Sequence, residues 1–118
     1  MSETGLIVMG PKGATIPQAT SIASATDFLS SDVTPKKSRS TFRLTVAFAT
    51  AAKLSYISDD GSNPTTNGFN DDTDLTAGQT YVWCWGVDAT NGYNFRHDDA
   101  GAIVINQFLL EEITGGVI

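Results

Sequence analysis

The sequence predicts an all-β protein, an antiparallel β-sandwich of the Greek-key or jelly-roll kind with roughly seven to nine strands. Three observations predict it. Polar and apolar side chains alternate in several segments with the period of two that half-buried strands have. No window of about a dozen residues combines helical spacing of apolar side chains with freedom from β-branched clusters, glycine and proline. Turn-rich stretches separate the alternating segments at short intervals.

The strands can be placed in chain order. Residues 42–48 (FRLTVAF) are the clearest strand, because every second residue is large and apolar. Residues 81–87 (YVWCWGV) alternate aromatic with small residues, which predicts a central strand covered on both faces and the most buried segment of the chain. Residues 102–113 (AIVINQFLLEEI) begin with β-branched residues and are interpreted as strand throughout. Shorter strands are expected at residues 6–9, 20–29, 53–57 and 93–96.

The length of 118 residues predicts one domain, residues 1–118, with a single hydrophobic core. Residues 10–31 are polar and lack strong periodicity, so residues 1–31 are a candidate for an extended N-terminal arm. The longest apolar stretches are far shorter than the roughly 20 residues that cross a bilayer, and no membrane association is expected. The first residues, MSET, lack the pattern of a secretory signal, so we do not expect export by a signal peptide.

Charge is distributed unevenly along the chain. The 13 acidic and 7 basic residues give a net charge of -6, the wrong sign for binding a phosphate backbone, so no nucleic-acid partner is expected. The basic residues of 33–58, including Lys36, Lys37 and Arg39, have no acidic neighbour in that stretch, whereas residues 59–99 are strongly acidic. We expect these unlike regions to serve head-to-tail contacts between subunits or docking onto another protein surface, with Lys36, Lys37 and Arg39 at the interface. The alternative is that folding intermixes the charges.

The residues that carry enzymatic chemistry are sparse. A single cysteine and a single histidine exclude an intramolecular disulfide and an ordinary zinc site. No sequence motif marks a serine nucleophile that could act with His97, and we interpret His97 as a solvated turn residue or a subunit-contact residue. Cys84, between Trp83 and Trp85, is interpreted as a small buried hydrophobic residue. We therefore expect no catalytic residues, no enzyme activity and no cofactor.

One acidic stretch resembles part of a calcium loop. Asn70, Asp72 and Asp74 have the oxygen spacing of its first positions. The later positions of an EF-hand are not met, because Leu75 stands where glycine is needed and Tyr81 where glutamate is needed. A looser calcium site that adds Asp59 and Asp60 is one hypothesis, and an ordinary solvated turn is the other.

Aromatic side chains offer an alternative binding function. Stacked on one face they would make a platform for a sugar, whereas in a protein of this size most of them should be core. The candidates are Tyr56, Phe69, Trp83, Trp85, Tyr93 and Phe95.

The stretch LTAGQTY at residues 75–81 resembles the turn that leads into a strand in fibronectin type III and other Greek-key sandwiches. The resemblance implies that Tyr81 is a structural corner residue, whose hydroxyl forms a hydrogen bond back to the chain.

As a whole, the sequence resembles small structural proteins of tailed-phage virions, such as capsid decoration or cement proteins. The shared features are an acidic β-rich chain with few cysteine or histidine residues and a polar N-terminal segment. The resemblance implies a location in the virion, self-association as a homotrimer or higher oligomer, and contact with the major capsid protein. Leu6, Ile7 and Val8 would then pair with a strand edge of a neighbour, or form the first strand of the sandwich. A tail, neck or fibre component, a carbohydrate-binding module and, last, a small hydrolase are the alternatives.

Overall fold

The protein is an antiparallel β-sandwich, as the sequence predicts. The structure is a computed structural model and describes residues 12–58 and 74–113. This part of the chain contains strands and turns, with no helix. The strands are β1 (Lys12–Ile16), β2 (Thr20–Ile22), β3 (Ser40–Phe48), β4 (Leu54–Ser58), β5 (Thr80–Val87), β6 (Tyr93–His97) and β7 (Ile103–Ile113).

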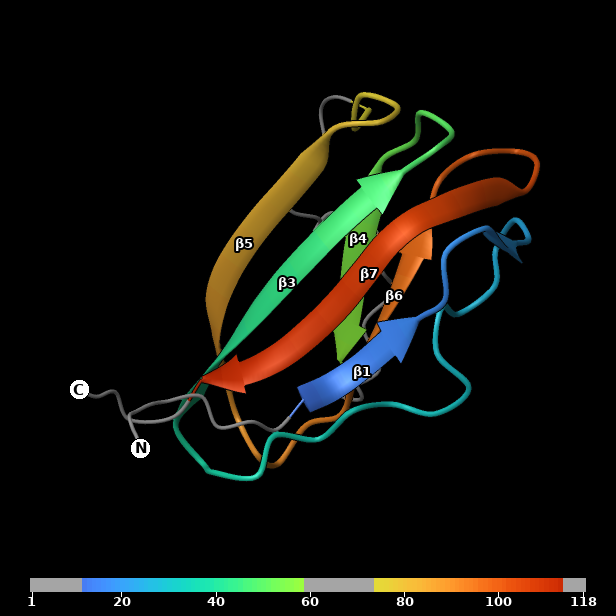
Figure 1. The fold of residues 1–118 in the computed structure, drawn as a ribbon. Helices are drawn as coiled ribbons and strands as arrows, with labels where there is room; N and C mark the ends of the chain where they lie inside the picture. Colours follow the sequence, from blue (N-terminus) through green and yellow to red (C-terminus); the bar gives the residue numbers. More distant parts are fainter. Residues whose placement is uncertain (1–11, 59–73, 114–118) are drawn as a thin grey trace.

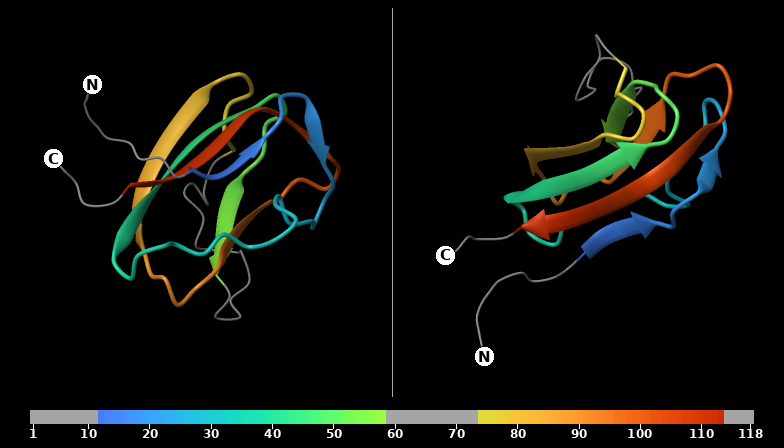
Figure 2. Two further views of the ribbon diagram at one scale, coloured as in Figure 1. Left: turned by 60° about the horizontal axis from the view of Figure 1, so that its bottom comes forward. Right: turned by 45° about the horizontal axis from the view of Figure 1, so that its top comes forward.

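Two sheets form the sandwich (Figure 1). The larger has the order β1-β7-β3-β5, with β2 also paired to β7, and the smaller consists of β4 and β6. From β3 to β7 the chain changes sheet at every step, and the smaller sheet lies behind the larger one (Figure 1). The right-hand view of Figure 2 shows the strands of the larger sheet side by side. A backbone bridge between Val33 and Tyr93 extends the smaller sheet beyond β6.

The core lies between the two sheets and follows the alternation of β3. Phe42, Leu44, Val46 and Phe48 are fully buried on the inner face. β7 contributes its own alternating residues, and its exposed Asn106 and Gln107 stand next to each other where the register with β3 shifts. This shift lets both halves of the longest strand direct apolar side chains inward.

The position of β5 differs from the sequence prediction. β5 is an edge strand of the larger sheet, paired with β3 alone among the described strands, and not a central strand. Its side chains alternate between exposed and half-buried along almost the whole strand. The prediction was wrong because alternation shows that a strand has two unlike faces but does not show how many neighbours it has. Cys84 points to the outer face and is exposed, so its interpretation as a buried hydrophobic residue was also wrong.

The N-terminal residues of the described chain belong to the sandwich. β1 and β2 both pair with β7, so residues 12–22 follow the edge of the larger sheet. The strand expected at residues 20–29 ends at Ile22, and Ala25 has a positive φ of 55°, which a strand does not accommodate. Leu6, Ile7 and Val8 lie outside the described residues.

Candidate functional site

The described residues contain no group of three or more His, Cys, Asp and Glu side chains that could hold a metal ion. Of the acidic and amide residues predicted for a calcium loop, the structure describes Asp74. The Asp74 carboxylate is 3.9 Å from the ammonium of Lys53. Asn70 and Asp72 lie outside the described residues, as do Asp59 and Asp60.

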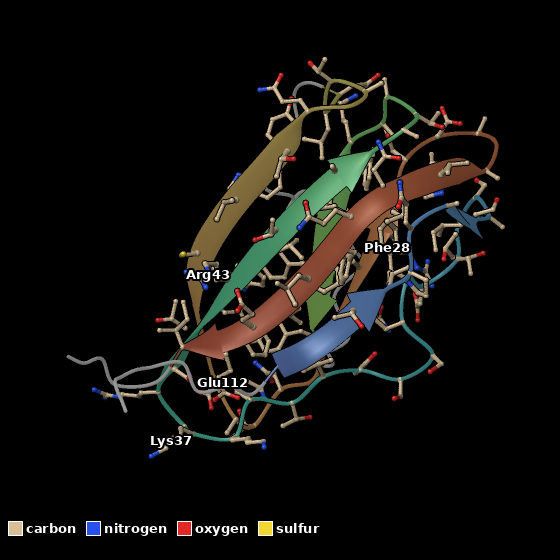
Figure 3. All side chains as sticks on the ribbon, in the orientation of Figure 1. Phe28, Lys37, Arg43 and Glu112 are labelled. Atoms are coloured by element: carbon tan, nitrogen blue, oxygen red, sulfur yellow. The ribbon has the colours of Figure 1, made fainter. Side chains whose placement is uncertain are left out.

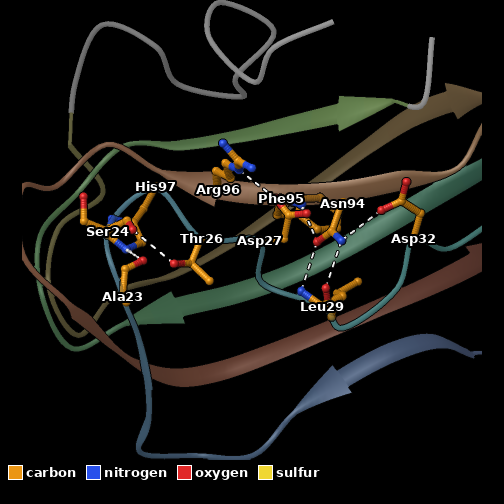
Figure 4. Close-up of polar contacts among 10 residues, drawn as sticks. All are labelled: Ala23, Ser24, Thr26, Asp27, Leu29, Asp32, Asn94, Phe95, Arg96 and His97. Atoms are coloured by element: carbon orange, nitrogen blue, oxygen red, sulfur yellow. Dashed lines mark hydrogen bonds and ion pairs between the residues drawn. The ribbon is translucent and has the colours of Figure 1, made fainter. Parts of the chain in front are cut away.

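His97 serves the fold. Its Nε2 lies 3.1 Å from the carbonyl of Ala23 (Figure 4). The same nitrogen lies 3.0 Å from the carbonyl of Ile22, and because a carbonyl only accepts, Nε2 is the donor in both contacts. Its Nδ1 accepts the backbone N–H of Asp99 at 3.1 Å. The ring is buried, and Phe28 packs against it edge to face, so the interpretation of His97 as a solvated turn residue was wrong. Both ring nitrogens are thus hydrogen-bonded to backbone groups of the chain.

The clearest surface feature is a basic loop, which we define as Lys36, Lys37 and Arg39. All of these side chains are exposed, and within residues 12–58 and 74–113 none forms an ion pair. The loop precedes β3 and lies at the end of the sandwich where β7 finishes (Figure 3). The structure thus places the three cations that the sequence analysis assigned to an interface together on one exposed loop.

A buried carboxylate holds the basic loop in place. Glu112, on the inner face of β7, is 7% exposed. Its Oε1 and Oε2 accept the backbone N–H of Lys36 at 2.8 and 2.9 Å, and Oε2 also accepts that of Lys37 at 3.2 Å. Because the carboxylate binds backbone amides, the two lysine side chains are left to point outward. Figure 3 shows Lys37 extending away from the sheet while Glu112 lies beneath β7.

The other described cations with placed side chains are paired within the chain. Arg43 lies 2.8 Å from Glu111 on the outer face of the large sheet. Lys53 approaches Asp98 at 3.4 Å, and the guanidinium of Arg96 contacts Asp27 at 2.6 Å. Folding has therefore intermixed part of the charge, and within residues 12–58 and 74–113 the side chains of the basic loop form no ion pair.

Acidic side chains gather at the opposite end of the sandwich. Asp98 and Asp99 follow β6, and Asp74 lies beside them across Lys53. The nine residues of β3 separate this end from the basic loop, which at about 3.3 Å per residue is roughly 30 Å. Acidic side chains also lie at the basic end. Asp88 lies with Arg39 around a shallow hollow of about 520 Å³, Glu112 binds the backbone of the basic loop, and Asp32 precedes Val33, which pairs with Tyr93.

Tyr81 lies at a corner of the large sheet. Its hydroxyl accepts the backbone N–H of Thr76 at 2.9 Å, which is the bond back to the chain that the resemblance implied. The Thr76 side chain and then its backbone amide lower the pKa of Tyr81 below its usual value of 10.0. Gly78 supplies the positive φ of 83° that this turn requires.

Aromatic side chains form a half-buried row on the inner face of β5. Tyr81 and Trp83 stack with ring planes 8° apart, and Trp85 packs against Tyr56 of β4 at 5.4 Å between ring centroids. Two other predicted platform residues, Tyr93 and Phe95, are core. Phe69 lies outside the described residues. The structure thus brings together three of the six predicted aromatics, with Tyr81 as an addition.

Sequence reasoning missed two buried polar side chains, Glu112 and Asn94. Asn94 is 1% exposed, and its amide bonds both backbone groups of Leu29 and the carboxylate of Asp32 (Figure 4). The sequence did carry a signal for both residues. Glu112 occupies an inward position of its strand, and Asn94 lies next to the inward residue Phe95. A polar residue there needs a buried partner.

The described residues include no helix long and apolar enough to cross a membrane. Comparison with protein-family models, with curated proteins and with solved structures found no match for this chain.

Proposed function

We propose that this protein is a non-enzymatic structural component of a tailed-phage virion, a capsid decoration protein that holds neighbouring subunits of the shell together. The viral setting rests on the resemblance of the sequence to small virion proteins. The mechanism is adhesion. A protein that binds the assembled shell and not its dissociated subunits stabilises the shell by mass action.

The observation that carries the proposal is the separation of charge between the two ends of the sandwich. The basic loop is exposed and held by Glu112 at one end, and Asp74, Asp98 and Asp99 lie at the other. Unlike charges at opposite ends favour head-to-tail contacts, which close into rings such as trimers when the rotation between subunits permits. The same basic loop suits an acidic patch on a major capsid protein. A tail, neck or fibre location would use the same contacts.

Removing the charge of the basic loop is expected to weaken self-association. In the variant Lys36→Gln, Lys37→Gln, Arg39→Gln, light scattering should show a smaller mass than for the wild type at the same low salt concentration. Raising salt should reduce the wild-type mass in the same way, because exposed charges are screened beyond about 8–10 Å at physiological ionic strength.

A control variant changes the net charge equally but elsewhere. Ser24→Asp, Ser30→Asp, Ser31→Asp alters exposed residues of the connection before β3 and leaves the basic loop intact. This control should associate as the wild type does. A wild-type protein that stays monomeric at every salt concentration, or equal loss in both variants, would overturn the head-to-tail mechanism.

A second candidate function is carbohydrate binding, which the row of Tyr81, Trp83, Trp85 and Tyr56 favours. Flat, partly exposed rings at one edge of a sandwich are suited to stack on sugar faces. A bound glycan is then expected to change tryptophan fluorescence in the wild type and to change it less in Trp83→Leu. Absence of binding across a broad glycan array would exclude this function.

A further inference from the structure

β1 and β2 form a unit of the large sheet that joins the rest of the described chain through one short connection. We define the β1–β2 unit as residues 12–22 and call the form in which it pairs with its own chain the closed form. Among the described strands, β1 and β2 pair with β7 alone. The unit also places Ile16 and Ile22 in the core. Its departure would leave an edge of β7 unpaired and a cavity in the core, unless an equivalent segment took its place.

The connection after the β1–β2 unit lies between two polar contacts with β6 (Figure 4). On one side the carbonyl of Ala23 accepts a hydrogen bond from the ring of His97. On the other side the carboxylate of Asp27 pairs with the guanidinium of Arg96. We define the hinge as the three exposed residues between these contacts, which are Ser24, Ala25 and Thr26. Because its residues are exposed, the hinge can change conformation without disturbing the core.

Ala25 strains the hinge in the closed form. Its φ of 55° lies in the left-handed region, where the Cβ of an L-residue crowds the backbone. This crowding disfavours the conformation by a factor of about 5–30 for a residue other than glycine. A hinge that straightens into an extended conformation removes the strain, so the sequence at Ala25 favours the open connection over the closed one.

The contacts of the β1–β2 unit specify a second copy of this chain as the partner. The unit of another copy carries the same residues, so it reproduces the register with β7, in which Thr15 stands opposite Leu109 and Thr20 opposite Ile105. It also returns Ile16 to the core. A reciprocal exchange therefore keeps the strand pairing and the buried side chains of the closed form and changes the hinge.

We propose that two copies of this chain exchange their β1–β2 units, with residues 24–26 extended as the hinge between them. This dimer does not rest on the head-to-tail contact of the proposed function. Its contacts are the strand pairs and core residues of the fold itself, so it persists at high salt, whereas the head-to-tail contact weakens as salt rises.

A disulfide between β1 and β7 distinguishes exchange from any other association. Opposite residues of an antiparallel pair have Cα atoms about 4.5–5.5 Å apart, which a disulfide spans. The variant Thr15→Cys, Leu109→Cys, Cys84→Ser therefore links β1 to β7 within one chain in the closed form and between two chains in the exchanged dimer. After refolding at high protein and salt concentration, oxidation should give a covalent dimer on a denaturing gel. A head-to-tail dimer would give only monomers with an internal link.

The same gel needs a measure of accidental linkage. Thr15→Cys, Cys84→Ser has one cysteine and can link chains only by collision, so its dimer sets the background. The variant with both new cysteines should exceed this background. Links within single chains alone, with no dimer above the background, would overturn the proposal.

Two alanines with positive φ provide matched variants of the hinge, both made in the chain with the two new cysteines. Ala25→Gly removes the strain of the closed form and should lower the dimerisation constant at least about tenfold. Ala19→Gly is the control, because Ala19 has a φ of 70° and is exposed but lies inside the exchanged unit, where both forms have the same conformation. Circular dichroism should show both variants folded, and the control should dimerise as its parent does. An unchanged dimer in Ala25→Gly, or an equal loss in both variants, would show that the hinge does not control exchange and would contradict the proposal.

Discussion

Replacing Asn94 by alanine should lower the free energy of unfolding by about 3 kcal/mol. The Asn94 Oδ1 accepts the backbone N–H of Leu29 at 3.0 Å, and its Nδ2 donates to the Leu29 carbonyl at 3.0 Å. These bonds tie the connection between β2 and β3 to β6. The substitution leaves the part-buried amide and carbonyl of Leu29 without their partner, and each such loss costs about 1–3 kcal/mol. Urea unfolding followed by circular dichroism measures the change.

Two further variants separate this effect from a general loss of volume. Asn94→Asp keeps the shape but turns an oxygen toward the Leu29 carbonyl and the Asp32 carboxylate, so it should destabilise at least as much as alanine. Asp32→Asn keeps an acceptor for the Nδ2 group at an exposed site and should cost under about 1 kcal/mol. A loss below about 0.5 kcal/mol for Asn94→Ala would contradict the assigned role.

The strand that became β7 was predicted from its β-branched residues, and its inward positions include the buried Glu112 as well as apolar residues. In β3, alternation predicted both the strand and its buried face, because every inward residue is large and apolar. The same signal misplaced β5. The tryptophans of β5 do face inward, but the opposite sheet has only the two described strands β4 and β6, and the tryptophans remain half-buried. Neither the size of the opposite sheet nor the neighbours of β5 can be derived from the sequence of β5 alone.

The partners of the polar residues that hold the loops could not be predicted from nearby sequence. Glu112 and Lys36 are separated by 76 residues, and Asn94 and Leu29 by 65. Nothing near Glu112 in the sequence shows that its partners are backbone amides. Conversely, the cluster of cations at residues 36–39 was visible in the sequence, whereas the pairing of Arg43 with Glu111 across the sheet was not. Local composition predicts a charged segment, and tertiary contacts decide which of its charges stay exposed.

The two adjacent glutamates of β7 give the last prediction. Glu112→Gln should lower the free energy of unfolding by about 2 kcal/mol, because hydrogen bonds to a buried carboxylate are stronger than those to an amide. The Gln side chain keeps one acceptor, but its NH₂ group would face the N–H of Lys36 or Lys37, which Glu112 now satisfies. Urea unfolding measures the loss.

Glu111→Gln is the matched control, since it removes the same charge one residue away. Glu111 lies on the outer face and pairs with Arg43, whose side chain is 44% exposed, and such pairs contribute under about 1 kcal/mol. Under conditions where both variants are folded, Glu112→Gln should also weaken salt-sensitive self-association although Lys36, Lys37 and Arg39 are all present, because the loop that carries them is no longer held. Equal stability and equal association in the two variants would show that the anchoring of the loop by Glu112 matters neither to the fold nor to assembly.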